Sequence, residues 1–203
     1  MLILHEFALS GNCYKIRLTA AHVGAVLTRR EYDIMTGETR TPEFLEQVSG
    51  NGRIPVLQIG DRFLPESNAA CFWLADGSPL IPADRFDRAD MLRWMSWEQY
   101  SHEPNVATMR FLRAFVGLDN MNETQVATVP MRIENGKAAL ALMDAHLSDR
   151  RWFVGESMTL ADICLYAYTH TAEEGGFVLA DYPAVTQWLA AVAGAPGHIV
   201  ITA

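Results

Sequence analysis

The chain has 203 residues, of which half are hydrophobic and a fifth are charged, and its formal net charge is −8; such values are typical of a soluble globular protein. Its basic residues are scattered, which argues against a nucleic-acid-binding protein, because such proteins concentrate them on one face. No apolar run has the length that a membrane span requires, and the first residues lack the basic leader of a secretory signal, so we expect a cytoplasmic protein that binds neither nucleic acid nor membranes.

The three cysteines, Cys13, Cys71 and Cys164, are odd in number and far apart in the sequence. This spacing fits neither a disulfide framework nor a zinc site. We therefore expect reduced thiols and no bound metal.

The first 76 residues predict the element order β-α-β-α-β-β-α. The expected strands are 2–7, 27–34, 55–59 and 62–64, and the expected helices are 14–23, 43–48 and 66–75. Gly24 is expected to end the first helix and Pro42 to open the second, since each residue type favours that position. Because the second strand follows a strand and a helix, it should pair parallel to the first.

Helix-breaking residues in 77–86 predict a linker, and the pattern changes after it. Segments 87–116, 124–148, 159–173 and 183–194 carry apolar residues at helical spacing. Thr159 and Asp162 have the spacing of a capping box at the third of these helices, and Pro104 is expected to bend the first. We thus expect a small α/β domain over 1–76, a linker over 77–86 and an all-helical domain over 87–203.

Pro55 raises a question, because it lies at the start of an apolar strand although proline cannot donate to a sheet. A β-α-β-α-β-β-α unit with a proline opening its third strand resembles the thioredoxin fold, in which that proline is cis and lies beside the active site. A cis X–Pro bond costs only about 0.5–1 kcal/mol relative to trans. It would turn the backbone N–H and C=O of Ile54 outward, where a bound peptide could pair with them like an added strand.

The whole chain resembles a cytosolic glutathione transferase of bacterial type. The motifs that carry this resemblance are SGNCYKIRL, NGRIPVL, PESNAA, TLAD and YPAVTQWLAAV, in this order and spacing. Two departures concern Ser49-Gly50, where the family usually has Asn-Pro, and Ala70, where it usually has a larger aliphatic residue. The resemblance implies a thioredoxin-like N-terminal domain, an all-helical C-terminal domain and a homodimer with its two-fold axis beside the cleft.

The resemblance also implies how glutathione would bind. Ser67 is expected to cap the following helix and to hold the γ-glutamyl carboxylate, with Glu66 near the ammonium group. The backbone at Ile54-Pro55 would pair with the tripeptide. Arg53, or as a second candidate Arg40, would pair with its glycine carboxylate.

Ser10 is the expected donor to the glutathione thiolate, because it stands where thioredoxin-like reductases have the first cysteine of C-x-x-C. Asn12 is expected to help or replace it. Cys13 is an alternative nucleophile, since a helix N-terminus lowers the pKa of a thiol. For the acceptor substrate, Tyr100 and His102 are the candidates in the helix 87–116.

The predicted function is therefore a glutathione transferase acting on small, mostly apolar electrophiles, with a role in detoxification. Two alternatives stay open. The same thiolate could reduce peroxides or disulfides, or the chain could be a transferase-like binding protein without catalysis.

Overall fold

The computed structural model describes residues 1–203. Contacts divide the chain into an N-terminal unit, residues 1–81 together with 196–203, and a helical unit, residues 82–195. Residues 196–203, expected from the sequence to belong to the helical domain, instead group with the N-terminal unit. The difference arises because the last segment bonds to the first helix, where Tyr14 Oη donates to the carbonyl of Ile199 at 2.5 Å.

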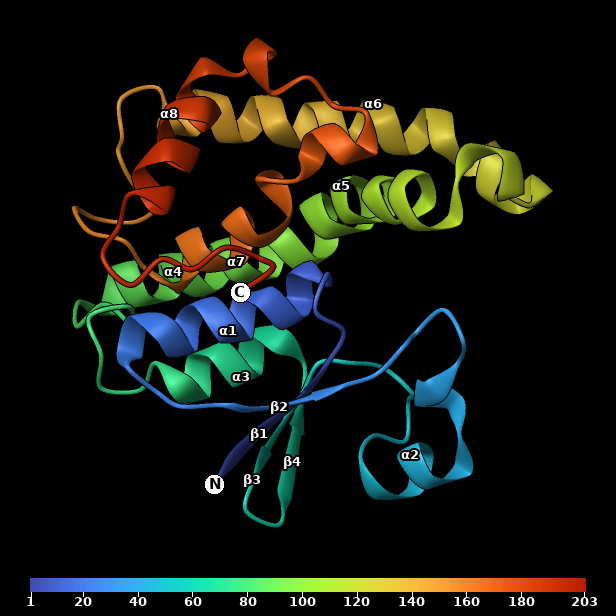
Figure 1. Ribbon diagram of the computed structural model, residues 1–203. Helices are drawn as coiled ribbons and strands as arrows, with labels where there is room; N and C mark the ends of the chain where they lie inside the picture. Colours follow the sequence, from blue (N-terminus) through green and yellow to red (C-terminus); the bar gives the residue numbers. More distant parts are fainter. The chain divides into compact units, whose positions relative to one another are not determined.

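The N-terminal unit has the predicted element order (Figure 1). Its elements are β1 (Leu2–Glu6), α1 (Gly11–Val23), β2 (Thr28–Glu31), η1 (Glu38–Arg40), α2 (Pro42–Gln47), β3 (Val56–Ile59), β4 (Arg62–Pro65) and α3 (Ser67–Leu74). Gly24 ends α1 in a left-handed conformation with φ 72°, and Pro42 is the first residue of α2. Both predictions are confirmed.

The four strands form one sheet in the order β2-β1-β3-β4. β1 pairs parallel to β2, as predicted, and β3 pairs antiparallel to both β1 and β4. The α/β prediction for this part of the chain is confirmed, and the sheet fixes where the loops beyond each strand end meet.

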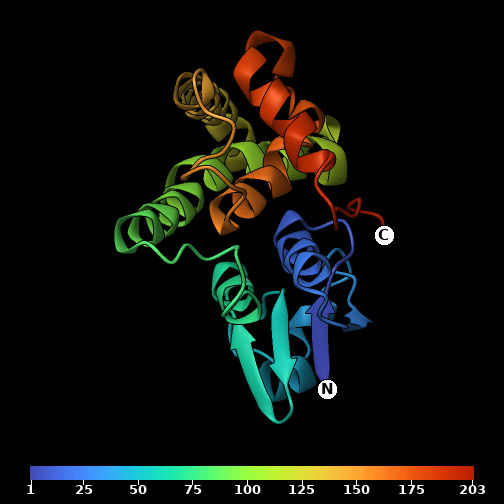
Figure 2. The ribbon, with the colours of Figure 1, turned by 90° about the vertical axis from the view of Figure 1, so that its left-hand side faces the viewer.

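The sheet separates two layers of packing. Figures 1 and 2 both show α1 and α3 side by side on one face of it. On the other face Tyr32 packs between His5 of β1 and Phe44 of α2, with ring centroids 5.7 Å and 4.9 Å away. Successive strand residues point to opposite faces, so Leu4 and His5 of β1 serve different layers.

The helical unit contains five longer α-helices joined by short π and 3₁₀ segments (Figure 1). They are α4 (Arg85–Trp97), η2 (Glu98–His102), α5 (Glu103–Arg110), η3 (Phe111–Val116), η4 (Leu118–Asn120), α6 (Glu123–Leu147), α7 (Leu160–Thr169), η5 (Ala172–Gly175), η6 (Leu179–Asp181) and α8 (Pro183–Ala193). The all-helical prediction is confirmed. None of these helices combines the length and apolar character needed to cross a membrane.

The predicted helix 87–116 is interrupted by two π-helical stretches, η2 and η3. At the end of η2 the N–H of Glu103 bonds to the carbonyl of Glu98, five residues earlier. Pro104 follows directly and has no N–H, so the regular bonding pattern cannot pass through it. The irregularity expected at Pro104 therefore takes the form of a widened turn just before it.

The capping box at α7 is confirmed. Thr159 is the N-cap, and Asp162 accepts from the backbone N–H of Thr159 at 2.8 Å. The same carboxylate accepts from Phe153 N and from Trp188 Nε1, each at 3.0 Å. Asp162 thus joins the start of α7 to the preceding loop and to α8.

Candidate functional site

The strand register brings three predicted site segments together at one edge of the sheet, where the ends of β1, β3 and β4 lie side by side. His5 of β1 lies opposite Val56 of β3, and Val56 lies opposite Pro65 of β4. Ser10 lies just beyond the end of β1. Ile54-Pro55 directly precede β3, and Glu66-Ser67 directly follow β4. The candidate site is therefore assembled by the sheet itself, from segments about 45 and 55 residues apart in the chain.

Ser10 is the N-cap of α1, with φ −71° and ψ 126°. Its Oγ accepts a hydrogen bond from the N–H of Cys13 at 3.4 Å. A hydroxyl has one proton to donate in addition to its acceptor lone pairs. The cap thus fixes the oxygen of Ser10 at the positive end of the helix. Its single O–H proton, which bonds to the Cys13 sulfur, can rotate to donate to a ligand there instead.

Asn12 and Ser67 connect the first turns of α1 and α3. Ser67 Oγ donates to Asn12 Oδ1 at 3.0 Å. Ser67 is the first residue of α3 and is buried, whereas Glu66 occupies the N-cap position without a side-chain cap bond. The predicted capping role of Ser67 is wrong, because its hydroxyl is directed across to α1.

Glu66 has the only positive φ among the non-glycine residues, at 70° with ψ 109°. Side chains rarely adopt this conformation, and holding one there costs about 1–3 kcal/mol. Glu66 is exposed. The strain turns the chain from β4 into α3 and presents the glutamate at the sheet edge, where the sequence analysis expected it to meet an ammonium group.

The Ile54–Pro55 peptide bond is cis, as predicted. Pro55 lies just before β3, so the missing N–H of proline does not interrupt the sheet. Arg53 is exposed at the preceding position, and its backbone N–H donates to Asn51 Oδ1 at 2.9 Å. The loop side chain Asn51 thereby fixes the approach to the cis bond.

Arg40 acts on the same loop. Its Nη1 donates to the carbonyl of Asn51 at 2.9 Å. The side chain packs so closely on Gly52, which has φ 64°, that a Cβ there would lie 2.6 Å from Arg40 Nη1. This contact supports the loop before Ile54-Pro55, a structural role beside the ligand role for which Arg40 was the second candidate.

Cys13 is fully buried, and its sulfur accepts from the N–H of Phe7 at 3.4 Å. Burial raises the pKa of this thiol to about 12, although hydrogen bonds from Ser10 and Phe7 oppose the shift. A thiol in this state is neither ionised nor accessible at neutral pH. The structure thus contradicts the alternative in which Cys13 is the nucleophile. No group of three or more histidine, cysteine or acidic side chains is arranged to hold a metal ion.

The two acceptor candidates have different surroundings. Tyr100 is 87% exposed and lines an open cavity of about 350 Å³ within the helical unit. The cavity is also lined by Trp97, Ser101, Asn105, Asn135, Ala138, Ala139 and Leu142. His102 is fully buried, and its Nε2 lies 3.0 Å from Thr169 Oγ1. His102 is therefore a hydrogen-bonded histidine of the core of the helical unit.

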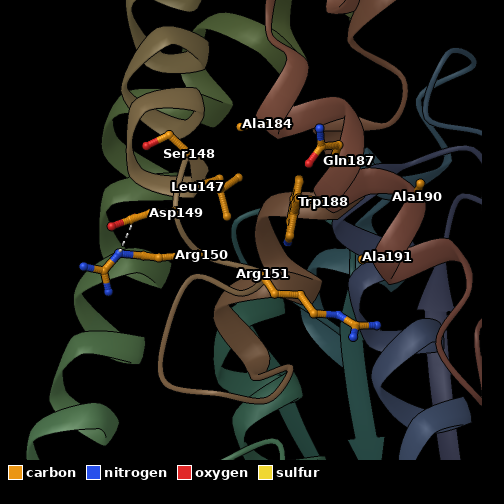
Figure 3. A pocket seen from close by; sticks show the side chains of 10 residues that line it. All are labelled: Leu147, Ser148, Asp149, Arg150, Arg151, Ala184, Gln187, Trp188, Ala190 and Ala191. Atoms are coloured by element: carbon orange, nitrogen blue, oxygen red, sulfur yellow. Dashed lines mark ion pairs between the residues drawn. The ribbon is translucent and has the colours of Figure 1, made fainter.

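A second cavity, of about 600 Å³, lies between the end of α6 and α8 (Figure 3). Arg150, Arg151, Gln187 and Trp188 are among its lining residues. Arg150 is paired with Asp149 at 3.5 Å, and both side chains are largely exposed. None of the predicted site residues lies here.

Sequence reasoning missed a buried ion cluster at the end of β1. Glu6 is fully buried and pairs with Arg17 of α1 at 3.0 Å and with Arg29 of β2. Burial raises the pKa of Glu6, while the two arginines oppose this shift. A charged residue closing an apolar strand and an arginine within a buried helix were the available signals, and each alone is also typical of a surface residue.

Two family models match the chain. The model described as Glutathione S-transferase, N-terminal domain, matches residues 2–76, and the model described as Glutathione S-transferase, C-terminal domain, matches residues 108–196. They match most of the N-terminal unit and the larger part of the helical unit.

Individual proteins of known name are also similar to this chain. A solved glutathione S-transferase from Pseudomonas fluorescens is 39% identical, with 98% of each chain covered and a TM-score of 0.93. Glutathione S-transferase 2 of Anopheles gambiae is 28% identical over 97% of this chain and 93% of that protein. Elongation factor 1-gamma 3 of Oryza sativa is 27% identical, covering 81% of this chain but only 39% of that longer protein.

Proposed function

Because the chain belongs to the glutathione S-transferase family, we propose that it activates the thiol of glutathione for attack on small, mostly apolar electrophiles. The observation that carries this proposal is the meeting of three segments at one sheet edge. They bring a hydroxyl at a helix start, a cis-proline backbone and the linked pair Asn12–Ser67 together.

Ser10 would stabilise the thiolate. A free thiol has a pKa near 8.5, so ionising most of it at neutral pH requires a drop of roughly two units, or about 2.7 kcal/mol. A hydrogen bond to a charged group contributes about 1.5–3 kcal/mol, and a helix N-terminus adds about 0.3–1 kcal/mol. The Ser10 hydroxyl and the start of α1 together suffice. The thiolate would then form a bond to carbon as the leaving group departs with its electron pair.

The γ-glutamyl end of glutathione would lie at the start of α3. Its carboxylate would meet the first N–H groups of that helix and Ser67, whose single hydroxyl proton would turn to it from Asn12 Oδ1. Its ammonium group would meet Glu66. The cysteinyl backbone would pair with Ile54 beside the cis bond. Arg53, exposed on the same approach, would meet the glycine carboxylate, with Arg40 as the second candidate.

The acceptor substrate is the less constrained part of the proposal. Tyr100 is exposed on a cavity and offers both a ring and a hydroxyl. We assign acceptor contact to Tyr100 and not to His102, which is buried against Thr169. A cytoplasmic homodimer with a role in detoxification completes the proposal, and light scattering at micromolar concentration tests its oligomeric state.

Two alternatives use the same site differently. Glutathione-dependent reduction of peroxides or disulfides needs the same thiolate. A non-catalytic binding protein is favoured by one observation, the similarity to elongation factor 1-gamma over most of this chain.

The deciding experiment combines binding with turnover. The protein is passed over immobilised glutathione and then assayed with a generic aromatic electrophile, a peroxide and a mixed disulfide. Binding with conjugation supports the transferase, and turnover of only the peroxide or disulfide supports the reductase. Binding without turnover supports the non-catalytic protein, and no binding at millimolar glutathione contradicts the proposal.

A further inference from the structure

Residues 196–203 form a strap that lies along α1 in the N-terminal unit. Tyr14 Oη donates to Ile199 O at 2.5 Å. Further along, Arg17 donates to Ile201 O at 2.8 Å and to Ala203 O at 2.7 Å. Each of these bonds ends on a main-chain oxygen of the strap. The side chains of α1 therefore hold the backbone of the strap, whatever side chains the strap carries.

Arg17 also holds the loop between β1 and α1. Its Nη2 donates to Ala8 O at 2.5 Å, and its Nε lies 3.0 Å from Glu6 Oε2. Ala8 stands two residues before Ser10, and Arg17 itself is only 4% exposed. One buried guanidinium thus joins the strand end, the loop and the strap.

The other polar groups of this loop are held as well. The N–H of Ala8 donates to Glu31 Oε1 at 2.6 Å. The N–H of Ser10 donates to Phe7 O at 2.9 Å. Glu31 ties the loop to β2, whereas Arg17 is the member of this set that ties it to the strap.

We propose that Arg17 is a positioning residue for Ser10, and that it holds the Ser10 loop in place by tying it to the strap 196–203. This inference rests on the proposed function, in which Ser10 stabilises the glutathione thiolate. A hydrogen bond to a thiolate requires the donor within a few tenths of an ångström of its place. The role of Arg17 is to keep the Ser10 hydroxyl there.

The choice of arginine follows from the geometry. A guanidinium presents five N–H donors in a planar fork, whereas an ammonium group is a single point. Lysine at this position could neutralise Glu6, but it could not reach Ala8, Ile201 and Ala203 together. Arg17→Lys therefore keeps the buried charge and removes the bridge.

Arg29 supplies a matched control. Like Arg17, it pairs with Glu6 and donates to Ala203 O, at 2.6 Å. None of its hydrogen bonds or ion pairs reaches Ala8, and it lies on β2 instead of α1. Arg29→Lys therefore disturbs the same carboxylate and the same strap residue without touching the Ser10 loop.

The test measures the pKa of the bound glutathione thiol from its thiolate absorbance in the wild type, Arg17→Lys, Arg29→Lys and Ser10→Ala. We expect Arg17→Lys to raise this pKa by about one unit, which lowers the thiolate fraction near pH 7 roughly threefold, and Arg29→Lys to leave it unchanged. Hydrogen exchange of amides 7–13 should become faster in Arg17→Lys and stay unchanged in Arg29→Lys. Tyr14→Phe, which removes one strap contact, should shift both readouts in the same direction by less.

The outcomes separate the two proposals. If the wild type lowers the thiol pKa and Ser10→Ala abolishes this, but Arg17→Lys behaves like Arg29→Lys, the positioning role is overturned and the proposed function stands. If the wild type does not lower the pKa at all, the proposed function fails. In that case the hydrogen-exchange rates of amides 7–13 still show whether Arg17 holds the Ser10 loop to the strap.

Discussion

The hydroxyl of Ser67 donates a hydrogen bond to the side-chain oxygen of Asn12 across 3.0 Å, linking the first turns of α3 and α1. The two residues are 55 positions apart, and one was expected to bind the γ-glutamyl group and the other to assist the thiolate. Their bond means that the two ends of the proposed glutathione site share one hydrogen-bond pair. Removing Ser67 should therefore affect the γ-glutamyl end most and reach the thiolate end only through Asn12, since Ser10 is outside this pair.

Ser67→Ala tests this link. The variant loses a donor to the γ-glutamyl carboxylate, so glutathione binding should weaken by about 1.5–3 kcal/mol, or roughly 10- to 150-fold in Kd. The turnover of the saturated enzyme should fall much less, because Ser10 is intact. Calorimetry gives Kd, and steady-state kinetics gives kcat.

A matched control is Ser96→Ala, which removes a helix hydroxyl that donates to Leu92 O in the helical unit. It should leave both Kd and kcat unchanged. A Ser67→Ala variant with normal Kd and reduced kcat would contradict the placement of the γ-glutamyl group.

Ser10→Ala removes the hydroxyl expected to stabilise the thiolate. The pKa of the bound glutathione thiol should rise by about one unit or more. The thiolate fraction at neutral pH, and with it the rate of conjugation, should therefore fall roughly threefold or more. Loss of the N-cap should also cost about 0.5–2 kcal/mol of stability. Thiolate absorbance as a function of pH measures the first effect, and denaturant unfolding measures the second.

Ser10→Thr separates these effects, because threonine keeps both the hydroxyl and the capping oxygen. It should recover most of the stability and part of the lowered thiol pKa. If Ser10→Ala leaves the thiolate absorbance unchanged, the donor is Asn12, since Cys13 is buried with its pKa raised to about 12.

Features set by local sequence were predictable. Gly24, Pro42 and the Thr159–Asp162 pair are residue types that favour a particular position at a helix end. All three predicted boundaries are confirmed. The cis bond at Ile54–Pro55 followed from the position of a proline at a strand start together with the family resemblance.

Features set by long-range contact were not predictable. The bond between Ser67 and Asn12 depends on how α1 and α3 pack, and the helix-cap preference of serine predicted a different partner. The strap 196–203 makes its contacts through main-chain oxygens, which leave no side-chain pattern in the sequence. Neither could have been found without the fold.

The strained backbone of Glu66 gives a prediction that separates an effect on stability from an effect on binding. Glu66→Gly removes the Cβ that disfavours φ 70°. Glu66→Ala removes the same carboxylate but keeps the strain. The glycine variant should therefore be more stable than the alanine variant by about 1 kcal/mol, after allowing for the greater entropy of unfolded glycine.

Both variants should bind glutathione about fivefold more weakly, because each loses the exposed partner of the ammonium group. Thermal unfolding and calorimetry on the two proteins give both quantities. Equal stabilities would contradict the prediction, because the strain at Glu66 would then be no larger than the entropy cost of glycine.

Asp162 gives a prediction on pH. Its carboxylate accepts four hydrogen bonds, which favour the ionised form, yet burial outweighs them and raises its pKa to about 6 from the usual 3.8. A folded pKa above the unfolded one means that the folded protein binds more protons between these values. The stabilisation from Asp162 is therefore complete below 3.8 and declines as pH rises through about 6.

Asp162→Asn removes this titration and places an amide N–H against a donor of Thr159, so it should destabilise the protein by about 1–3 kcal/mol. The difference from wild type should be larger near pH 4 than near pH 7.5, and should change most around pH 5–6. Thr159→Ala is the control, because it loses the cap but keeps the carboxyl and hence the pH dependence. Denaturant unfolding across this range measures the difference, and one that grows with rising pH would mean that the four hydrogen bonds outweigh burial at Asp162.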